Sequence, residues 1–237
     1  MLVVCLDLEG VLMPEVWVNV AERTGIEELR RTTRDEPDYD KLMRYRLDIL
    51  DSNGITMDDI SAAIESMDPL DGAVEFLDQL RSKWQVVILS DTFAQFAAPM
   101  MDKLGRPTIL CHTLEVDEES RRVTGWEIRM EDQKRHAVEA LRGLNFNVIS
   151  SGDSYNDTSM LAASNAGILI NPPSNVVEEF PQYPVVNELR AVTGPHRGCC
   201  ISNGRVVVQS IEIRAVGRRD AWQSGTAYPV ASHQADA

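Results

Sequence analysis

The sequence predicts an α/β fold in which a parallel sheet carries helices on both faces and a helical subdomain is inserted after the first strand. Short apolar runs rich in β-branched residues, typical of strands buried on both faces, alternate with amphipathic helical segments. Residues 15–70, between the first two such runs, show helical patterns only. Composition agrees with a globular protein, since 43% of the 237 residues are hydrophobic and 25% are charged.

Unbroken apolar runs predict the strands of the sheet. The segments 114–116 and 123–128 flank the polar tip DEESRR, an arrangement that is typical of a β-hairpin. The remaining predicted strands are 2–6, 86–89, 108–111, 147–150 and 167–170.

Amphipathic segments between these runs predict the helices. Pro14 is a favourable first-turn residue, so a helix is expected to begin near it and to end before Gly25. The other predicted helices are 38–52, 56–67, 71–84, 93–104, 132–141 and 155–163.

The helical insert divides the predicted core into two pieces. We expect a discontinuous α/β core over 1–14 and 71–190, and a helical subdomain over 15–70. Residues 191–237 differ in composition, because they contain no Lys and far fewer acidic residues than the rest. Within them 204–213 predicts a strand or hairpin, and the remainder of this divergent tail is expected to be a flexible appendage.

Acidic residues outnumber basic ones by 37 to 23, and the formal net charge is −14. Such a chain repels nucleic acid and anionic membranes, so neither is expected as a partner. An anionic substrate would need local positive charge from a metal ion and one or two basic side chains. We expect no targeting segment, and no run approaches the roughly 20 apolar residues of a membrane span. The four cysteines show no C-x-x-C spacing and are typical of reduced thiols in a cytoplasmic protein.

Polar residues follow the predicted strands where open α/β sheets bind their ligands, beyond the carboxyl ends of the strands. Asp7 and Glu9 come after the first strand, and alternation along an extended chain can point both the same way. Ser90, Asp91 and Thr92 come after the second strand. A simpler interpretation makes the first group a polar turn and the second a helix N-cap, and a helix N-terminus can itself bind phosphate.

Two further signals lie later in the chain. The run GDSYND at 152–157 follows a predicted strand, and its two carboxylates, four residues apart, suit a hard divalent cation. Helix capping explains the same run equally well. Lys134 is the last lysine of the chain and lies in a predicted helix, where a lone lysine is usually solvated.

Taken in order, these residues resemble the four motifs of the haloacid dehalogenase-like phosphohydrolases. The family pattern is D-x-D-x-[TV], a Ser or Thr after the second strand, a Lys, and G-D-x-x-x-D. This chain has Asp7-Leu8-Glu9-Gly10-Val11, Ser90, Lys134 and GDSYND, and departs from the pattern at Glu9, where the family has Asp. The runs DLEGV, SDT and GDSYND are similar to a narrower group of phosphoserine phosphatases that also transfer the phosphoryl group to homoserine, over residues 1–186.

The resemblance implies a Rossmann-like core with an all-helical cap and assigns chemical roles to the motif residues. Asp7 would be the nucleophile that becomes an aspartyl phosphate, and Glu9 the general acid and base. Mg²⁺ would be held by Asp7, Asp153, the backbone carbonyl of Glu9 and Asp157. The phosphoryl oxygens would be bound by Ser90, the backbone N–H of Asp91, and Lys134.

The resemblance also places substrate selection in the helical cap. Arg46 lies on the apolar stripe of its helix, where a long side chain usually reaches out to solvent. In the resembled group an arginine at this place binds the substrate carboxylate, an acid matching Glu15 binds the ammonium, and Asn156 contacts substrate. A simpler interpretation of Glu15 is that its negative charge only stabilises a helix N-terminus. The implied substrate is L-phosphoserine, with homoserine as a second acceptor and a homodimer as the candidate assembly.

Two other functions remain open at the level of sequence. One is a phosphatase of the same fold for another small phosphorylated metabolite. The other is a non-catalytic regulator similar to a phospho-receiver domain, although such domains are about half this length and carry no helical insert. A dehalogenase is disfavoured, because it has no need of the carboxylates Asp153 and Asp157.

Overall fold

The computed structural model describes residues 1–32, 35–36, 38–187 and 189, and the backbone of three short strands between 200 and 214. The chain forms two compact units, residues 1–196 and 197–237, which are described separately.

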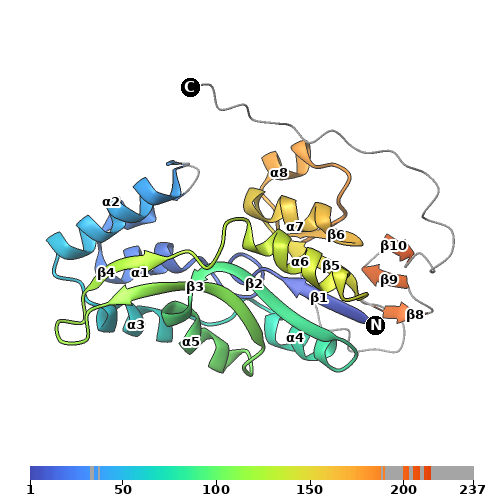
Figure 1. Cartoon of the computed structure of the whole chain (residues 1–237), viewed down its shortest axis with the longest axis horizontal. Coiled ribbons are helices and arrows are strands. Elements are labelled where there is room, and N and C mark those ends of the chain that lie inside the picture. Colours follow the sequence, from blue (N-terminus) through green and yellow to red (C-terminus); the bar gives the residue numbers. More distant parts are fainter. Residues whose placement is uncertain are drawn as a thin grey trace. The chain divides into compact units, whose positions relative to one another are not determined.

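A seven-stranded sheet forms the centre of the first unit (Figure 1). The strand order is β4-β3-β2-β1-β5-β6-β7, and every neighbouring pair is parallel except β3 and β4. This confirms the predicted parallel sheet and the predicted hairpin. The strands are β1 Leu2–Leu6, β2 Gln85–Phe93, β3 Thr108–Val116, β4 Val123–Glu127, β5 Asn147–Gly152, β6 Ala166–Ile170 and β7 Val185–Val186.

Helices cover both faces of the sheet, as the sequence predicts. Figure 1 shows α4 (Ala73–Arg81) and α5 (Ala94–Lys103) on one face, and α6 (Gln133–Gly143) and α7 (Thr158–Ala163) on the other. The central strand β1 is buried on both faces, which explains its unbroken apolar sequence. Its alternate residues Val3 and Cys5 pack in a core cluster with Leu89, Val138, Val148 and Met160.

The segment between β1 and β2 is helical wherever the structure describes a regular element in it. It contains α1 (Val16–Thr24), a 3₁₀ turn η1 (Glu27–Arg30), α2 (Tyr39–Ser52) and α3 (Met57–Glu65). Local signals set the ends of these helices: Gly25, with φ of 71°, terminates α1, and the Asp38 side chain accepts a hydrogen bond from the Lys41 N–H to cap α2. A capping box between Thr56 and Asp59 begins α3. The boundary of a separate cap over 15–70 stays a prediction.

The second strand is longer than the sequence suggests. Ser90, Asp91 and Thr92 lie within β2 rather than after it, because pairing with β3 resumes at Phe93 and His112 beyond an irregularity in register. The helix α5 therefore begins at Ala94 with no side-chain cap, and the N-cap interpretation of these three residues is wrong. Similarly, 108–116 forms one continuous strand and not two.

Two short elements near the end of the first unit have no counterpart in the predictions. These are α8 (Ser174–Glu179) and the two-residue strand β7, both too short for a periodic pattern. Instead of one predicted helix over 155–163, a 3₁₀ turn η2 (Tyr155–Asp157) precedes α7.

The second unit contains a three-stranded antiparallel sheet in the order β10-β9-β8. Its strands are β8 Cys200–Ser202, β9 Arg205–Val208 and β10 Ile211–Arg214. The pairing of β9 with β10 confirms the predicted hairpin. The predicted flexible tail at 191–199 and 215–237 lies outside the described residues.

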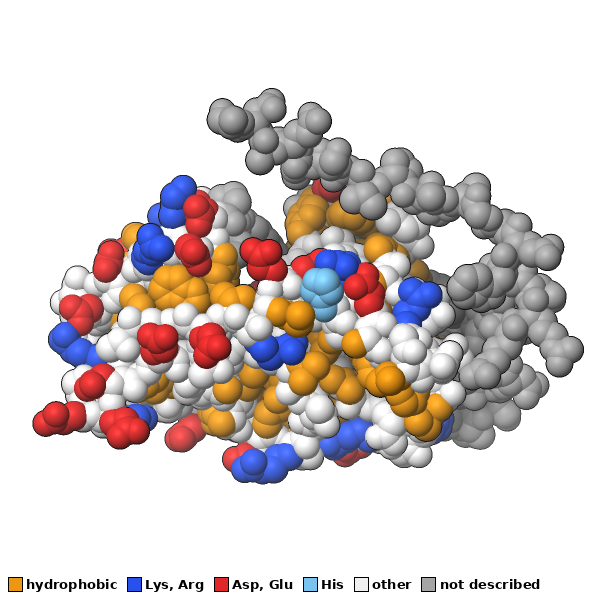
Figure 2. Space-filling view, in the orientation of Figure 1, with side chains coloured by type: hydrophobic (Ala, Val, Ile, Leu, Met, Phe, Trp, Pro, Cys, Tyr) orange, Lys and Arg blue, Asp and Glu red, His pale blue; other side chains and the backbone are white. Residues whose placement is uncertain are grey.

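On the face drawn in Figure 2, acidic and basic side chains are interspersed, and its described part shows no broad basic patch. Within the described residues, every helix is too short or too polar to span a bilayer.

Gly72 provides a test of how the start of α4 is fixed. It has φ of 78°, and a Cβ there would lie 1.8 Å from the Leu189 carbonyl oxygen. We expect Gly72→Ala to lower the free energy of unfolding by at least about 2 kcal/mol, because backbone strain and a backbone clash add. Urea denaturation monitored by circular dichroism measures this change.

Gly143→Ala is the matched control, because a Cβ at Gly143 meets no atom within 4 Å. Since Gly143 ends α6, this variant should be neutral or more stable by up to about 1 kcal/mol. Equal effects of the two substitutions would contradict the role given to Gly72.

Candidate active site

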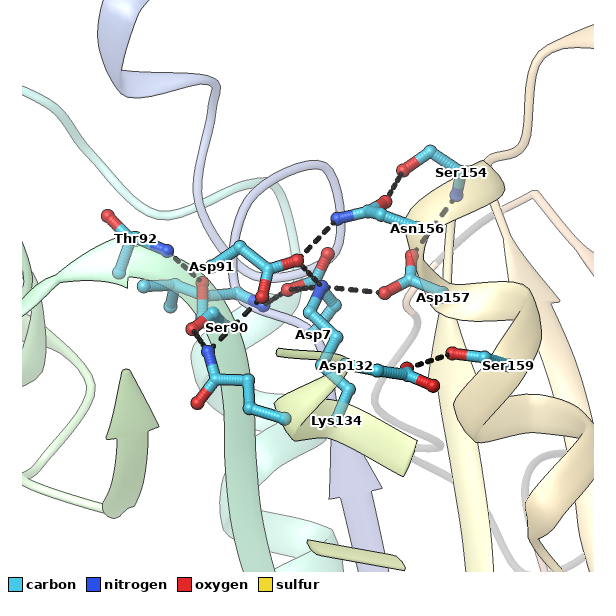
Figure 3. Close-up of polar contacts among 12 residues, drawn as sticks. Asp7, Ser90, Asp91, Thr92, Asp132, Lys134, Ser154, Asn156, Asp157 and Ser159 are labelled. Carbon is cyan, nitrogen blue, oxygen red and sulfur yellow. Dashed lines mark hydrogen bonds and ion pairs between the residues drawn. The ribbon is translucent and has the colours of Figure 1, made fainter. Parts of the chain in front are cut away.

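The predicted site residues of the core converge at the carboxyl ends of β1, β2 and β5 (Figure 3). Asp7 directly follows β1, and its backbone N–H donates to the Ser151 carbonyl of β5 at 2.9 Å. One of its carboxylate oxygens accepts from the Leu8 N–H at 2.8 Å. These bonds fix a buried carboxylate between two central strands.

Lys134 lies in the first turn of α6 and joins the carboxylates of three segments. Its Nζ is 2.8 Å from Asp157, 3.0 Å from Asp7 and 3.4 Å from Asp91. The side chain is only 2% exposed, so the solvated interpretation is wrong. Burial disfavours the ammonium, but the three carboxylates outweigh this effect and hold the pKa of Lys134 well above its usual value.

Asp7, Asp153 and Asp157 form a buried acidic triad whose carboxylate oxygens lie within 4.8 Å of one another. Burial, together with the charge of Asp157, raises the pKa of Asp7 well above its usual value and that of Asp153 to about 7. Lys134 alone does not offset so much negative charge. Three converging carboxylates are the donor set that a hard divalent cation prefers, so the triad fits such an ion.

Two glycines make room for this triad. Gly10 has φ of 77°, and a Cβ on it would lie 2.5 Å from an Asp153 carboxylate oxygen. A Cβ on Gly152 would lie 2.2 Å from Cγ of Asp157. Asp157 also accepts from the backbone N–H groups of Asp153 and Ser154, at 2.9 and 3.2 Å. The capping interpretation of this run is therefore compatible with a role in the site.

Glu9 lies apart from the triad. Its Oε2 accepts from the backbone N–H of Val16 at 2.9 Å, in the first turn of α1. Burial, and then the neighbouring Glu15, raises the pKa of Glu9 to about 7, although the hydrogen bond from the Val16 N–H opposes this shift. A carboxyl group with such a pKa is suited to proton transfer near neutral pH. Metal binding by the Glu9 carbonyl stays a prediction.

The sequence analysis missed two buried residues beside Asp91. Gln133 donates to the Ser90 carbonyl at 2.6 Å and to the Asp91 carboxylate at 3.2 Å. His112 places Nε2 3.6 Å from the same carboxylate. Gln133 only precedes a motif lysine, and His112 falls between two predicted strands, so neither carried a clear signal. If 108–116 had been predicted as one continuous strand, His112 would have stood out as a polar residue inside it.

The proposed substrate residues differ in how they are placed. Asn156 is exposed and donates to the Asp91 carboxylate at 3.0 Å, which joins it to the core cluster. Arg46 is 6% exposed, donates to the Arg31 carbonyl at 2.8 Å and stacks over the Trp17 ring at 4.4 Å. Its Nε has no partner within the described residues, and none of their carboxylates lies within ion-pair distance of it.

Among the residues that the structure describes, Arg46 is thus a buried cation without an anion, and the interpretation in which it reaches solvent is wrong. Burial lowers its pKa to about 10, against the opposing charges of Tyr39, Glu9 and Glu15. Glu15 is exposed, and its charge acts on Glu9, Arg46 and Asp153 alike. The structure therefore brings together a core group around Lys134 and, beside it, a second group of Glu9, Glu15 and Arg46.

The triad predicts a pH-dependent response to metal. In the folded protein Glu9 and Asp153 have pKa values of about 7, above their ordinary values of 4.5 and 3.8. Their protonated forms stabilise the fold below about pH 4, and this contribution is lost as the pH rises through about 7. Mg²⁺ should restore stability at about pH 8, by about 2.7 kcal/mol at a hundredfold excess over its Kd.

Urea denaturation with EDTA or Mg²⁺, at about pH 5 and about pH 8, measures both effects. Asp153→Asn should flatten the pH dependence of the metal-free protein and abolish the gain from Mg²⁺. Asp48→Asn, a neutralisation on an exposed part of α2, is the matched control and should behave as the parent. A gain from Mg²⁺ that survives Asp153→Asn would exclude the triad as the metal site.

The chain is similar to known proteins over most of its length. A profile of the haloacid dehalogenase-like hydrolases matches residues 7–162. The chain is 56% identical over 185 residues to phosphoserine phosphatase ThrH of Pseudomonas aeruginosa, covering 78% of this chain and 90% of that protein. It is also 56% identical over 185 residues to a phosphoserine phosphatase of Pseudomonas syringae pv. tomato, covering 78% of each. A solved substrate-bound phosphoserine phosphatase complex shares the fold, with a TM-score of 0.65, 18% identity, and coverage of 79% of this chain and 93% of that one.

The matched segment runs from Asp7, through Lys134, to beyond Asp157, and so it spans the whole core cluster. Fold, motif order and identity to the relatives agree with one another. The chain therefore belongs to the haloacid dehalogenase-like hydrolase family.

Proposed function

We propose that the protein is a Mg²⁺-dependent phosphomonoesterase that acts on L-phosphoserine through an aspartyl phosphate on Asp7, and that homoserine is a second phosphoryl acceptor. The observation that carries the proposal is the pairing of two unlike groups. A buried carboxylate and lysine cluster suits a phosphoryl group, while the buried Arg46 lacks an anionic partner among the described residues. A phosphate ester with a carboxylate end satisfies both.

At the phosphoryl end, the Asp7 carboxylate attacks phosphorus and the bond from phosphorus to the serine oxygen breaks. Glu9 gives its proton to the leaving alkoxide and then takes one from the acceptor, whose oxygen attacks phosphorus and releases Asp7. Ser90, the Asp91 N–H and Lys134 hold the phosphoryl oxygens. Mg²⁺, held by Asp7, Asp153, Asp157 and the Glu9 carbonyl, would supply charge neutralisation when bound.

At the amino-acid end, the planar guanidinium of Arg46 can bind a carboxylate through paired hydrogen bonds. Glu15 would bind the substrate ammonium, and Asn156 would contact the substrate from the side of the core. The charges support this division, since Glu15 and Arg46 act electrostatically on each other. The names of the two relatives with 56% identity support the same substrate.

Hydrolysis and transfer to homoserine share one intermediate and differ only in the acceptor. Glu9 is one methylene longer than the Asp of the family pattern, so its carboxyl group lies differently over the same phosphorus. We infer that this geometry admits an alcohol in place of water. The proposal places the enzyme in the cytoplasm, in serine and threonine biosynthesis, as a homodimer whose helical cap covers 15–70.

Phosphorus NMR of the purified protein with Mg²⁺ and L-phosphoserine, with and without L-homoserine, tests this proposal. We expect inorganic phosphate from phosphoserine alone and an additional phosphohomoserine signal when homoserine is present. Asp7→Asn should give neither signal, because no phosphoryl-enzyme forms. Unchanged phosphoserine with folded parent protein would refute the substrate, and phosphate without phosphohomoserine would refute the second acceptor.

Arg46 predicts a selective loss of affinity. Arg46→Ala should raise KM for phosphoserine at least about thirtyfold, since loss of one partner of a buried charge pair costs at least about 2 kcal/mol. KM for p-nitrophenyl phosphate, which has no carboxylate, should change less than about threefold. Steady-state kinetics with both substrates measures the difference.

Arg44→Ala, on the exposed side of the same helix, is the matched control and should change neither KM. Arg46→Lys retains the charge but loses the paired geometry, so its effect should be intermediate. Equal increases in KM for both substrates would mean that Arg46 only supports the fold.

A further inference from the structure

The carboxylate of Asp91 is a feature that the proposed mechanism does not use, because only its backbone N–H has a role there. Its side chain is 37% exposed, although it lies beside the buried core cluster. Figure 3 shows it next to Lys134, with Asn156 on one side. A negative group so close to the proposed phosphate site opposes the binding of a phosphate anion.

Hydrogen bonds from the side chains of Gln133, at 3.2 Å, and Asn156, at 3.0 Å, hold this carboxylate in place. His112 accepts from the Arg129 N–H at Nδ1, at 3.2 Å, which leaves the proton on Nε2, 3.6 Å from Asp91. Gln133 accepts from the Arg129 guanidinium at Oε1, at 2.8 and 3.1 Å, which turns its Nε2 towards Asp91. Lys134 and these donors outweigh burial and hold the pKa of Asp91 well below its usual range.

Three carboxylates already surround the ammonium group that would bind a phosphoryl oxygen. Lys134 donates a hydrogen bond to Asp157 at 2.8 Å, and Asp7 and Asp91 lie at 3.0 and 3.4 Å in ion-pair contact. A phosphoryl oxygen at Lys134 therefore competes with carboxylate oxygens for the same positive charge. Asp91 makes the longest of these contacts and is the most exposed of the three, so its contact with Lys134 is the one that a phosphoryl oxygen replaces.

We propose that the Asp91 carboxylate competes with phosphoryl oxygens for Lys134 and thereby weakens the binding of free inorganic phosphate. This inference rests on the proposed function, because it takes Lys134 as the phosphoryl-binding group. Phosphoserine offsets the competition through its contacts with Arg46 and Glu15, whereas inorganic phosphate has no carboxylate or ammonium group to make such contacts. Asp91 therefore favours release of phosphate and discriminates against esters that lack an amino-acid end.

The Asp91→Asn variant distinguishes competition for Lys134 from a purely structural role of the Asp91 side chain. The amide oxygen can still accept from Gln133, while the NH₂ group turns towards Lys134 and cannot accept from it. We expect the variant to bind inorganic phosphate and orthovanadate about tenfold more tightly, as removal of a like charge predicts. Isothermal titration calorimetry with Mg²⁺ present measures both affinities. An unchanged or weaker affinity would overturn the proposal.

Asp132→Asn is the matched control, since Asp132 has nearly the same exposure, 36%, and contacts Arg135 and Ser159. It makes the same change in net charge without touching the Lys134 contacts that the structure describes. Its affinity for phosphate should stay within about twofold of the parent. An equal gain in both variants would show a general effect of charge and contradict competition at Lys134.

Two further measurements keep the test decisive. If Asp91→Asn fails to fold by circular dichroism, Asp91→Ser, which also removes the charge, carries the same expectation. The ratio of kcat/KM for phosphoserine to kcat/KM for p-nitrophenyl phosphate should be lower in the Asp91 variant than in the parent. A higher ratio in the variant would contradict the proposal. Turnover of phosphoserine by the parent tests the proposed function separately, so parent activity without tighter phosphate binding in the variant overturns this inference alone.

Discussion

The buried ammonium of Lys134 is the interaction on which the arrangement of the site depends. Asp7 from the end of β1, Asp91 from β2 and Asp157 from η2 all lie within ion-pair distance of it. Without that charge, these carboxylates would repel one another in a poorly solvated space. One lysine does not balance them together with Asp153, and this imbalance is what makes the cluster receptive to a divalent cation.

In the proposed function, chemistry and substrate selection come from different parts of the chain. The residues of the proposed phosphoryl site lie at strand ends of the core and in α6, whereas Glu15 and Arg46 come from the helical insert. Glu9 links the two regions, since it follows Asp7 by two residues and accepts from the first turn of α1. Under this proposal, a change of substrate arises in the insert while the phosphoryl site stays the same.

The parts of this arrangement that sequence could predict are those with a local cause. Continuous apolar runs predicted the parallel strands, and Asp7 and the GDSYND run gave the acidic triad because residues at strand ends converge in such a sheet. The roles of His112 and Gln133 depend on pairing between β2 and β3, and on α6 reaching across to Asp91, which no short pattern records. That no carboxylate of the described part of the chain pairs with Arg46 is likewise visible only when its neighbours are known. For the same reason, the extent of β2 through Ser90–Thr92 was missed.

The position of β1 in the sheet has a consequence for synthesis of the chain. The strand β1, which Asp7 directly follows, lies in the centre and is made before both of its partners, β2 and β5, and β5 ends only at Gly152. Because long-range pairings form slowly and expose apolar edges meanwhile, β1 must wait, unpaired on one edge, until β5 has left the ribosome. Asp7, whose N–H binds the Ser151 carbonyl, is thus translated long before the strand that fixes its position.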